Sequence, residues 1–250
     1  MATEADRRVY GAGIGTAEAA QIDVGLRQYM LRVYNYMASG LLLSGIVAAL
    51  VANSSLGQLF FQVNEAGRMG YTGLGLIAAF TPIGLILAMS FGANRMSAGT
   101  LQVLYWAFVG TMGVGLSSAL MLYTGVSVLR VFFITAIAFA SLSLYGYTTK
   151  RDLSAFGTFL IMGLVGLMIA SIVNIFMQST MMHFIISAVG VLVFAGMTAF
   201  DTQKIKSMYL QGFGSYELAQ KSAIMGAVTL YLDFVNLFQF LLQFLGQRRD

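Results

Sequence analysis

Two aspartates, Asp201 and Asp233, lie in the last two long apolar stretches of this chain. A carboxylate at membrane depth costs roughly 2.5–3.5 kcal/mol on insertion scales, so such a residue usually has a partner or a water-filled cavity. Two carboxyl groups that touch in a low-dielectric site cannot comfortably both ionise, and they should titrate as a unit. Loss of their shared proton would push the helices apart or recruit a hard cation such as calcium, which prefers oxygen ligands. The pair is therefore a candidate proton-sensing or metal site, and a neutral, purely structural pair is the alternative.

The stretches that carry these residues indicate a membrane protein. The chain is 58% hydrophobic and 10% charged, whereas soluble domains contain about 25% charged residues. A run of about 20 apolar residues crosses a bilayer core. Seven such runs are present, at residues 33–53, 72–91, 101–123, 126–146, 155–178, 181–201 and 222–245. We expect an all-α integral membrane protein with a cytoplasmic N-terminal segment (1–32), one seven-helix domain (33–245) and a short tail (246–250).

Redox and metal-cluster chemistry have little support in the composition. The chain has no cysteine, so it has neither a thiolate nucleophile nor a zinc site built on sulfur. His183 is the single histidine, and one histidine at the start of an apolar stretch is weak evidence for a metal site. We expect no cofactor.

The net charge of +4 is distributed in a way that favours a lipid bilayer over nucleic acid as the partner. Basic residues gather in alternate loops, as the positive-inside rule requires of cytoplasmic segments. With the N-terminus inside, the cytoplasmic set is Arg7, Arg8, Arg27, Arg32, Arg95, Lys150, Arg151, Lys204, Lys206 and Lys221. Arg68 is the basic residue of the far-side loops.

Arg130, Arg248 and Arg249 oppose this simple topology. Arg130 lies just inside the fourth stretch, from which it can snorkel to the outer surface. Arg248 and Arg249 would be outside if the seventh stretch spans fully, and a re-entrant last segment would return them to the inside. A seventh helix buried among the others permits either arrangement.

Polar residues inside the spans point to the interior of the bundle. Asp233, Asn236 and Gln243 are spaced i, i+3 and i+10, which places them along one side of a helix. We expect six helices to enclose this helix, with Asn236, Gln243 and Asn174 as candidate pore-lining residues. Asp201 can reach the depth of Asp233 if the sixth helix continues through Lys204 and Lys206.

Three segments that surround these residues resemble the transmembrane Bax inhibitor motif family, also called the Bax inhibitor-1-like family. They are GYTTKRDLSAFG (146–157), FAGMTAFDTQKI (194–205) and TLYLDFVNLF (229–238). The resemblance implies a seven-helix fold whose last helix is enclosed by the other six, and a proton-sensitive calcium leak. It also implies that Asp201 and Asp233 form the pH-sensing dyad, and Arg95 is the nearest equivalent of an arginine that latches onto that dyad. Similarity to prokaryotic members implies a bacterial inner membrane.

Three functions from different classes follow. The first is a cation leak, mainly of calcium ions, that protons gate through the dyad. The second is a non-transporting stress regulator that binds other membrane proteins, among them a membrane-anchored ATP-dependent protease. The third is an intramembrane aspartyl protease, which also needs two aspartates on adjacent helices. Its motifs are absent, because Asp233 follows Tyr231-Leu232 and Asp201 follows Phe200, with no Gly-x-Gly before either. We therefore expect no enzymatic activity.

Overall fold

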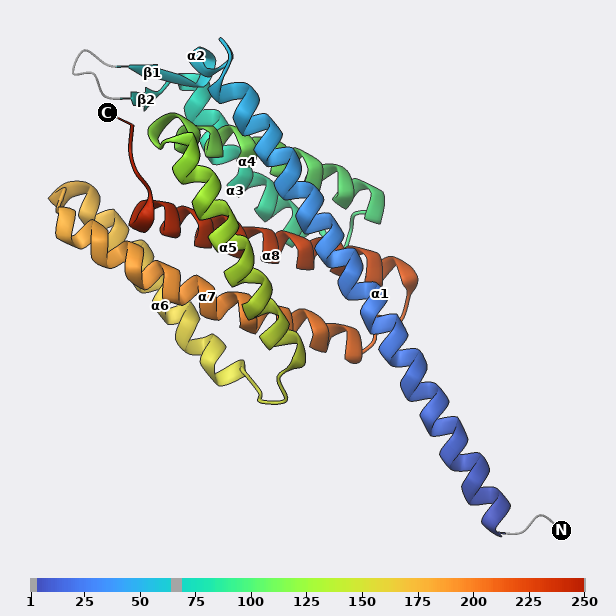
Figure 1. The fold of residues 1–250 in the computed structure, drawn as a ribbon. Helices are drawn as coiled ribbons and strands as arrows, with labels where there is room; N and C mark the ends of the chain where they lie inside the picture. The colour runs from blue at the N-terminus through green and yellow to red at the C-terminus, as the bar shows by residue number, and fades with distance from the viewer. Residues whose placement is uncertain (1–3, 64–68, 250) are drawn as a thin grey trace.

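The computed structural model describes residues 4–63 and 69–249, with side chains from residue 23 onward. Seven long helices make up most of the chain (Figure 1). They are α1 (Glu4–Ala52), α3 (Gly73–Gly92), α4 (Ala98–Leu122), α5 (Gly125–Thr148), α6 (Ser154–Met177), α7 (Thr180–Leu210) and α8 (Tyr216–Leu245). A single-turn helix, α2 (Gly57–Phe60), and a small antiparallel hairpin of β1 (Phe61–Val63) and β2 (Met69–Tyr71) connect α1 to α3. The sequence did not predict this hairpin.

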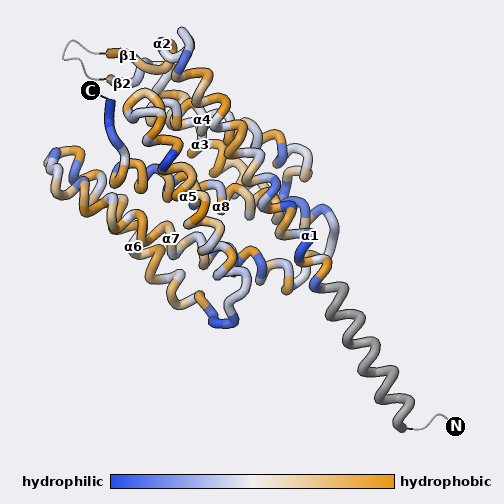
Figure 2. Tube along the Cα trace, viewed as in Figure 1, coloured by the Kyte–Doolittle hydropathy of each residue, from blue (hydrophilic) through white to orange (hydrophobic). Residues whose placement is uncertain are grey.

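All seven long helices contain a segment that is long and apolar enough to span a membrane, which confirms the predicted fold class. Five of them begin after a Ser or Thr whose hydroxyl accepts a hydrogen bond from a backbone N–H of the first turn, the preferred helix N-cap. These caps are Thr72, Ser97, Thr124, Ser179 and Ser215. Hydrophobic residues line the helices and polar residues gather at the ends (Figure 2). Local sequence thus sets where most of the spans begin.

Three helices extend well beyond the apolar stretches that predicted them, and one of these is α8, which begins at Tyr216 and not at residue 222. α7 continues to Leu210, through Lys204 and Lys206, which is the condition for Asp201 to reach Asp233. α1 packs into the bundle from Leu26 onward, about two turns before the predicted boundary at residue 33. Polar residues can continue a packed helix past the hydrocarbon core because water satisfies them there, so hydropathy alone marks the end too early.

Helix α8 is the central helix of the bundle, as expected. Most of its apolar segment is buried, compared with a minority of each other span. It packs against α1, α4, α5 and α7, while α3 packs mainly on α4 and α6 mainly on α7. The enclosure is therefore made chiefly by four helices, with α3 and α6 as an outer layer.

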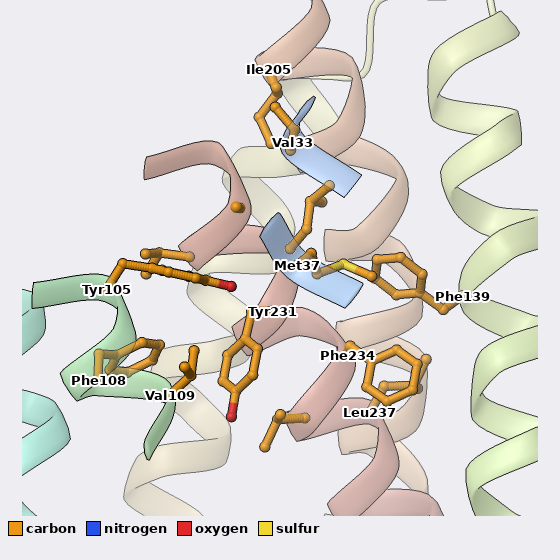
Figure 3. Close-up of a cluster of buried hydrophobic side chains, with 14 of the residues drawn as sticks. Val33, Met37, Tyr105, Phe108, Val109, Phe139, Ile205, Tyr231, Phe234 and Leu237 are labelled. Atoms are coloured by element: carbon orange, nitrogen blue, oxygen red, sulfur yellow. The ribbon is translucent and has the colours of Figure 1, made fainter. Parts of the chain in front are cut away.

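Large apolar and aromatic side chains from several helices pack together around α8 (Figure 3). Hydroxyl groups beside them form hydrogen bonds between helices. Tyr231 is fully buried, and its hydroxyl lies 2.6 Å from the Ser44 hydroxyl of α1. Ser44 in turn donates to the Val109 carbonyl of α4 at 2.7 Å. The Phe108 ring meets the Tyr231 ring edge to face at 5.4 Å. These contacts tie α1, α4 and α8 together, and a buried tyrosine of this kind needs such a partner.

The C-terminal tail lies at the end of the bundle that carries the β-hairpin, which excludes a re-entrant α8 (Figure 1). α8 is one continuous helix, and the residues after it bond to the turn between α4 and α5. Gln247 accepts from the Thr124 N–H and donates to the Ser127 hydroxyl, and Arg249 bonds to Leu122 and Tyr123 carbonyls. Hydrogen bonding thus holds Arg249 and the adjacent Arg248 at the hairpin end of the bundle, which the other basic residues predict to be the outer end.

Other basic residues of the predicted cytoplasmic set share one end of the bundle. Arg95 lies in the α3–α4 loop, Lys150 and Arg151 in the α5–α6 loop, and Lys221 at the start of α8, all at the end opposite the tail. Arg130 is exposed near the outer end of α5. The side chains of Arg7 and Arg8, and the whole of Arg68, lie outside the described residues.

The absence of cysteine makes this topology directly testable. In an otherwise unchanged chain, Gln247→Cys should react with a membrane-impermeant maleimide from outside intact cells, whereas Asn94→Cys should react only after the membrane is opened. Both side chains are in exposed segments that end or connect helices. Labelling of both positions from the same side would contradict a full span of α8.

Two glycines of the segment 146–157 allow α5 and α6 to approach α7 at the level of Asp201. A Cβ at Gly146 would overlap the Ala199 carbonyl, and a Cβ at Gly157 would overlap the Phe200 ring. Ala199 and Phe200 directly precede Asp201. The glycines therefore fix the distance of α5 and α6 from the helix that carries the first carboxyl group.

Gly146→Ala should lower the stability of the bundle by about 1–3 kcal/mol, because the added methyl group meets backbone that cannot rotate away. Gly84→Ala is the matched control, since a Cβ there would meet no atom within 4 Å apart from its chain neighbours and the backbone of its own helix. Thermal unfolding in detergent should show a lower midpoint for Gly146→Ala and an unchanged or higher midpoint for Gly84→Ala. Equal midpoints would show that α5 and α7 can separate without cost.

Candidate functional site

Asp201 of α7 and Asp233 of α8 face each other inside the bundle. Their side chains are 5% and 3% exposed, so neither is solvated, and their carboxyl groups are hydrogen-bonded to each other. An ionised carboxylate can only accept hydrogen bonds, so one member of the pair must carry the proton between them. The chain thus brings together the two residues that the sequence singled out.

One oxygen of this pair lacks a conventional donor. Within the described part of the chain, Asp233 Oδ2 is the buried side-chain polar atom that receives no hydrogen bond from an N–H or hydroxyl group. An unsatisfied buried acceptor costs roughly 1–3 kcal/mol, and such atoms in native structures often mark a strained or functional position. Asp233 Oδ2 is therefore able to bind a proton, a water molecule or a cation.

The basic group near the pair is not Arg95. Lys204 follows Asp201 by one turn on α7 and acts on its carboxyl group electrostatically. Arg95 is exposed in the α3–α4 loop, and its side chain makes no hydrogen bond or ion pair with the described residues. In this arrangement the candidate latch is therefore disengaged from the dyad.

The three candidate pore-lining residues lie in different surroundings. Gln243 accepts a hydrogen bond from the Ser187 hydroxyl at 3.3 Å, near the outer end of α8. Asn236 is half-buried and donates to the Leu232 carbonyl of its own helix. Asn174 accepts from the Ser179 N–H and so satisfies the α6–α7 turn. Asn174 is a turn residue at the outer end, and it does not lie beside the dyad.

An outer vestibule of about 380 Å³ opens among α3, α4, α7, α8 and the tail. Its lining includes Gln243 together with His183, Gln239, Tyr123 and Arg248. Gln239 was not singled out in the sequence because it is off the i, i+3, i+10 spacing. It lies about 9 Å along the helix from Asp233, at a rise of 1.5 Å per residue. Neither aspartate lines the vestibule, which therefore ends short of the pair.

Residues that follow Asp201 on α7 hold the α5–α6 loop. The Gln203 amide donates to the Arg151 carbonyl at 2.7 Å, and its oxygen accepts from the Leu153 N–H at 2.8 Å. Lys206 Nζ donates to the Tyr147 carbonyl at 2.7 Å. We call the two hydrogen bonds of Gln203 the Gln203 clamp. They join segment 194–205 to segment 146–157, which explains why both segments carry polar residues next to a span.

Asp152 forms a side-chain turn immediately before α6. Its carboxylate accepts from the Ser154 N–H at 2.9 Å. Hydrogen bonds from the Ser154 hydroxyl and backbone hold the pKa of this exposed carboxyl group below its usual value. The Asp152 carboxyl group is therefore ionised at neutral pH.

A hydroxyl chain links α1, α5 and α7 next to the dyad. The Tyr34 hydroxyl lies 2.6 Å from the Ser143 hydroxyl, which lies 2.9 Å from that of Thr202. Thr202 is adjacent to Asp201 and donates to the Thr198 carbonyl. Sequence reasoning missed Gln203, Ser143 and Tyr34, because single polar residues near span ends are common; only the segment 194–205 gave a signal, at Gln203.

Gln203→Leu should loosen the α5–α6 loop, since it removes two hydrogen bonds worth about 1–2 kcal/mol together. Trypsin should then cut faster after Lys150 and Arg151 in detergent-solubilised protein. Gln211→Leu is the control, because Gln211 is exposed and its side chain bonds to no described residue. A cleavage rate that is the same in both variants and the unmodified chain would contradict the clamp.

The fold and the site define a seven-helix membrane protein with a buried pair of carboxyl groups on its two most buried helices. Residues 26–250 match the protein family described as inhibitor of apoptosis-promoting Bax1. The chain therefore belongs to the Bax inhibitor-1-like family of multi-pass membrane proteins, as its three segments indicated.

Bacterial relatives cover almost the whole chain. An uncharacterised protein of Rickettsia prowazekii is 48% identical, over 94% of this chain and 96% of its own length. The inner membrane protein YbhL of Escherichia coli is 41% identical, over 90% of this chain and 94% of its own. An uncharacterised membrane protein of Streptococcus pyogenes is 32% identical, over 91% of this chain and 96% of its own. These names agree with a membrane protein, and none of them names an enzyme.

Proposed function

We propose that this chain mediates a pH-sensitive leak of calcium ions across a bacterial inner membrane, and that the Asp201–Asp233 pair is its gate. The observation that carries the proposal is the buried, hydrogen-bonded pair with an unpartnered Oδ2 on Asp233. A pair that holds one proton can change its charge with pH, and it lies between two helices that meet at the centre of the bundle.

Protonation state controls the force between α7 and α8 in this proposal. With the proton in place, the hydrogen bond holds the helices together. Without it, two negative charges face each other in a site from which water is largely excluded, where repulsion is far stronger than in water. The repulsion is relieved when the helices separate or when a cation binds, and calcium is the cation that suits carboxylate oxygens.

The surroundings support a closed gate in the present arrangement. The outer vestibule stops short of the pair, and the Arg248 side chain at its lining opposes the entry of cations. A continuous path would require α7 to move relative to α8. The Gln203 clamp would carry such a movement to the α5–α6 loop on the cytoplasmic side.

The deciding experiment is calcium flux through purified protein in liposomes that contain a calcium dye. The double variant Asp201→Asn and Asp233→Asn keeps the size and hydrogen-bonding capacity of the pair but removes its titratable charge. Its flux should be independent of pH and equal to that of the unmodified chain at acid pH, where both carboxyl groups are neutral. Each single variant should change the pH response about as much as the double, because the proton belongs to the pair.

Glu217→Gln is the control, since that carboxylate is exposed and pairs with Lys221 at 3.2 Å. It should leave the pH dependence intact. If the double variant folds and its leak still varies with pH, the Asp201–Asp233 pair does not gate the leak. No leak from the unmodified chain at any pH would favour the second function, a regulator that binds a membrane-anchored ATP-dependent protease or another membrane protein.

A further inference from the structure

A second cavity, of about 680 Å³, lies between α1 and α5 in the cytoplasmic half of the bundle. Met30 and Met37 of α1 and Phe139 of α5 form its walls, and Phe234 of α8 also lines it. The two helices pack on α7 and α8 far more than on each other. The Tyr34–Ser143 hydrogen bond joins them across this cavity. We call the cavity the α1–α5 groove.

The groove opens sideways from the bundle. Leu31 and Leu144, which line it from opposite helices, are 50% and 62% exposed. In a membrane protein, what lies beside such residues is lipid. An apolar groove that faces hydrocarbon is filled by an acyl chain, since water would find few polar partners there.

The cytoplasmic end of the groove is basic. Arg27 lines it and is exposed, so its guanidinium group can reach the level of lipid phosphates. Tyr147 also lines it, and Lys206 Nζ lies 5.1 Å from the centre of the Tyr147 ring. Asp23, one turn before Arg27 on α1, forms no ion pair with it in the described structure. Arginine is suited to phosphate recognition because its planar guanidinium group can donate two parallel hydrogen bonds.

We propose that the α1–α5 groove binds one anionic phospholipid of the cytoplasmic leaflet. Its acyl chain lies against Met30, Phe139 and Phe234, and its phosphate group meets Arg27 with the charge of Lys206 nearby. Basic pockets between membrane helices on the cytoplasmic side are a recognised setting for lipid head groups. The bound lipid supplies the packing that α1 and α5 do not give each other. The site is independent of the proposed leak, although Phe234 is adjacent to Asp233.

Native mass spectrometry of the full chain in detergent tests the site with phosphatidylglycerol as the probe and phosphatidylcholine as the uncharged comparison. The unmodified chain should retain one phosphatidylglycerol at concentrations where phosphatidylcholine is lost. Arg27→Gln should weaken binding by about tenfold, the loss expected for a charge-assisted hydrogen bond. Ala140→Trp, which places a large ring in the groove, should abolish it.

Matched controls separate the groove from general effects on the bundle. Arg130→Gln removes an exposed arginine from α5 near the outer end, and Ile137→Trp places the same ring on the exposed side of α5, outside the groove. Both should bind phosphatidylglycerol as the unmodified chain does. Equal retention of the two lipids by the unmodified chain would overturn the proposal without any variant. Full binding by Ala140→Trp, or an equal loss in Arg27→Gln and Arg130→Gln, would overturn it as well.

Discussion

The burial of Asp201 and Asp233 side by side is the main constraint on this bundle, because a carboxyl group at membrane depth needs a polar partner. α7 and α8, which carry the pair, are the most buried spans. The other helices pack around them. α1, α4 and α5 cover the remaining sides of α8, and α6 covers α7.

The residues around the pair connect α7 tightly to its neighbours. Ala199 and Phe200 contact α5 and α6 through glycines, and Gln203 holds the backbone of the α5–α6 loop. Any displacement of α7 at Asp201 would therefore reach α5, α6 and the loop between them. Bundles packed through small residues transmit such displacements, because backbones in contact cannot absorb them by side-chain rotation.

The tail shows how specific contacts override a statistical rule. Two arginines at the outer end oppose the positive-inside tendency. The tail nevertheless bonds to the α4–α5 turn through Gln247 and Arg249, and the Arg248 side chain lies 6.0 Å from the Tyr123 ring. Several hydrogen bonds and a cation–π contact hold the tail at this end of the bundle. The charge count alone left both topologies open, because Arg248 and Arg249 oppose an outside tail.

The sequence by itself determined the number of spans, their order and the two aspartates, since hydropathy and a charge at membrane depth are properties of single segments. It also gave the family, through three segments with fixed spacing. Only the tertiary structure decided which residues meet. It placed Lys204 rather than Arg95 near the dyad, assigned Asn174 to a turn, and revealed the Gln203 clamp and the α1–α5 groove. These depend on how helices distant in sequence are rotated and spaced, which no periodicity within one helix specifies.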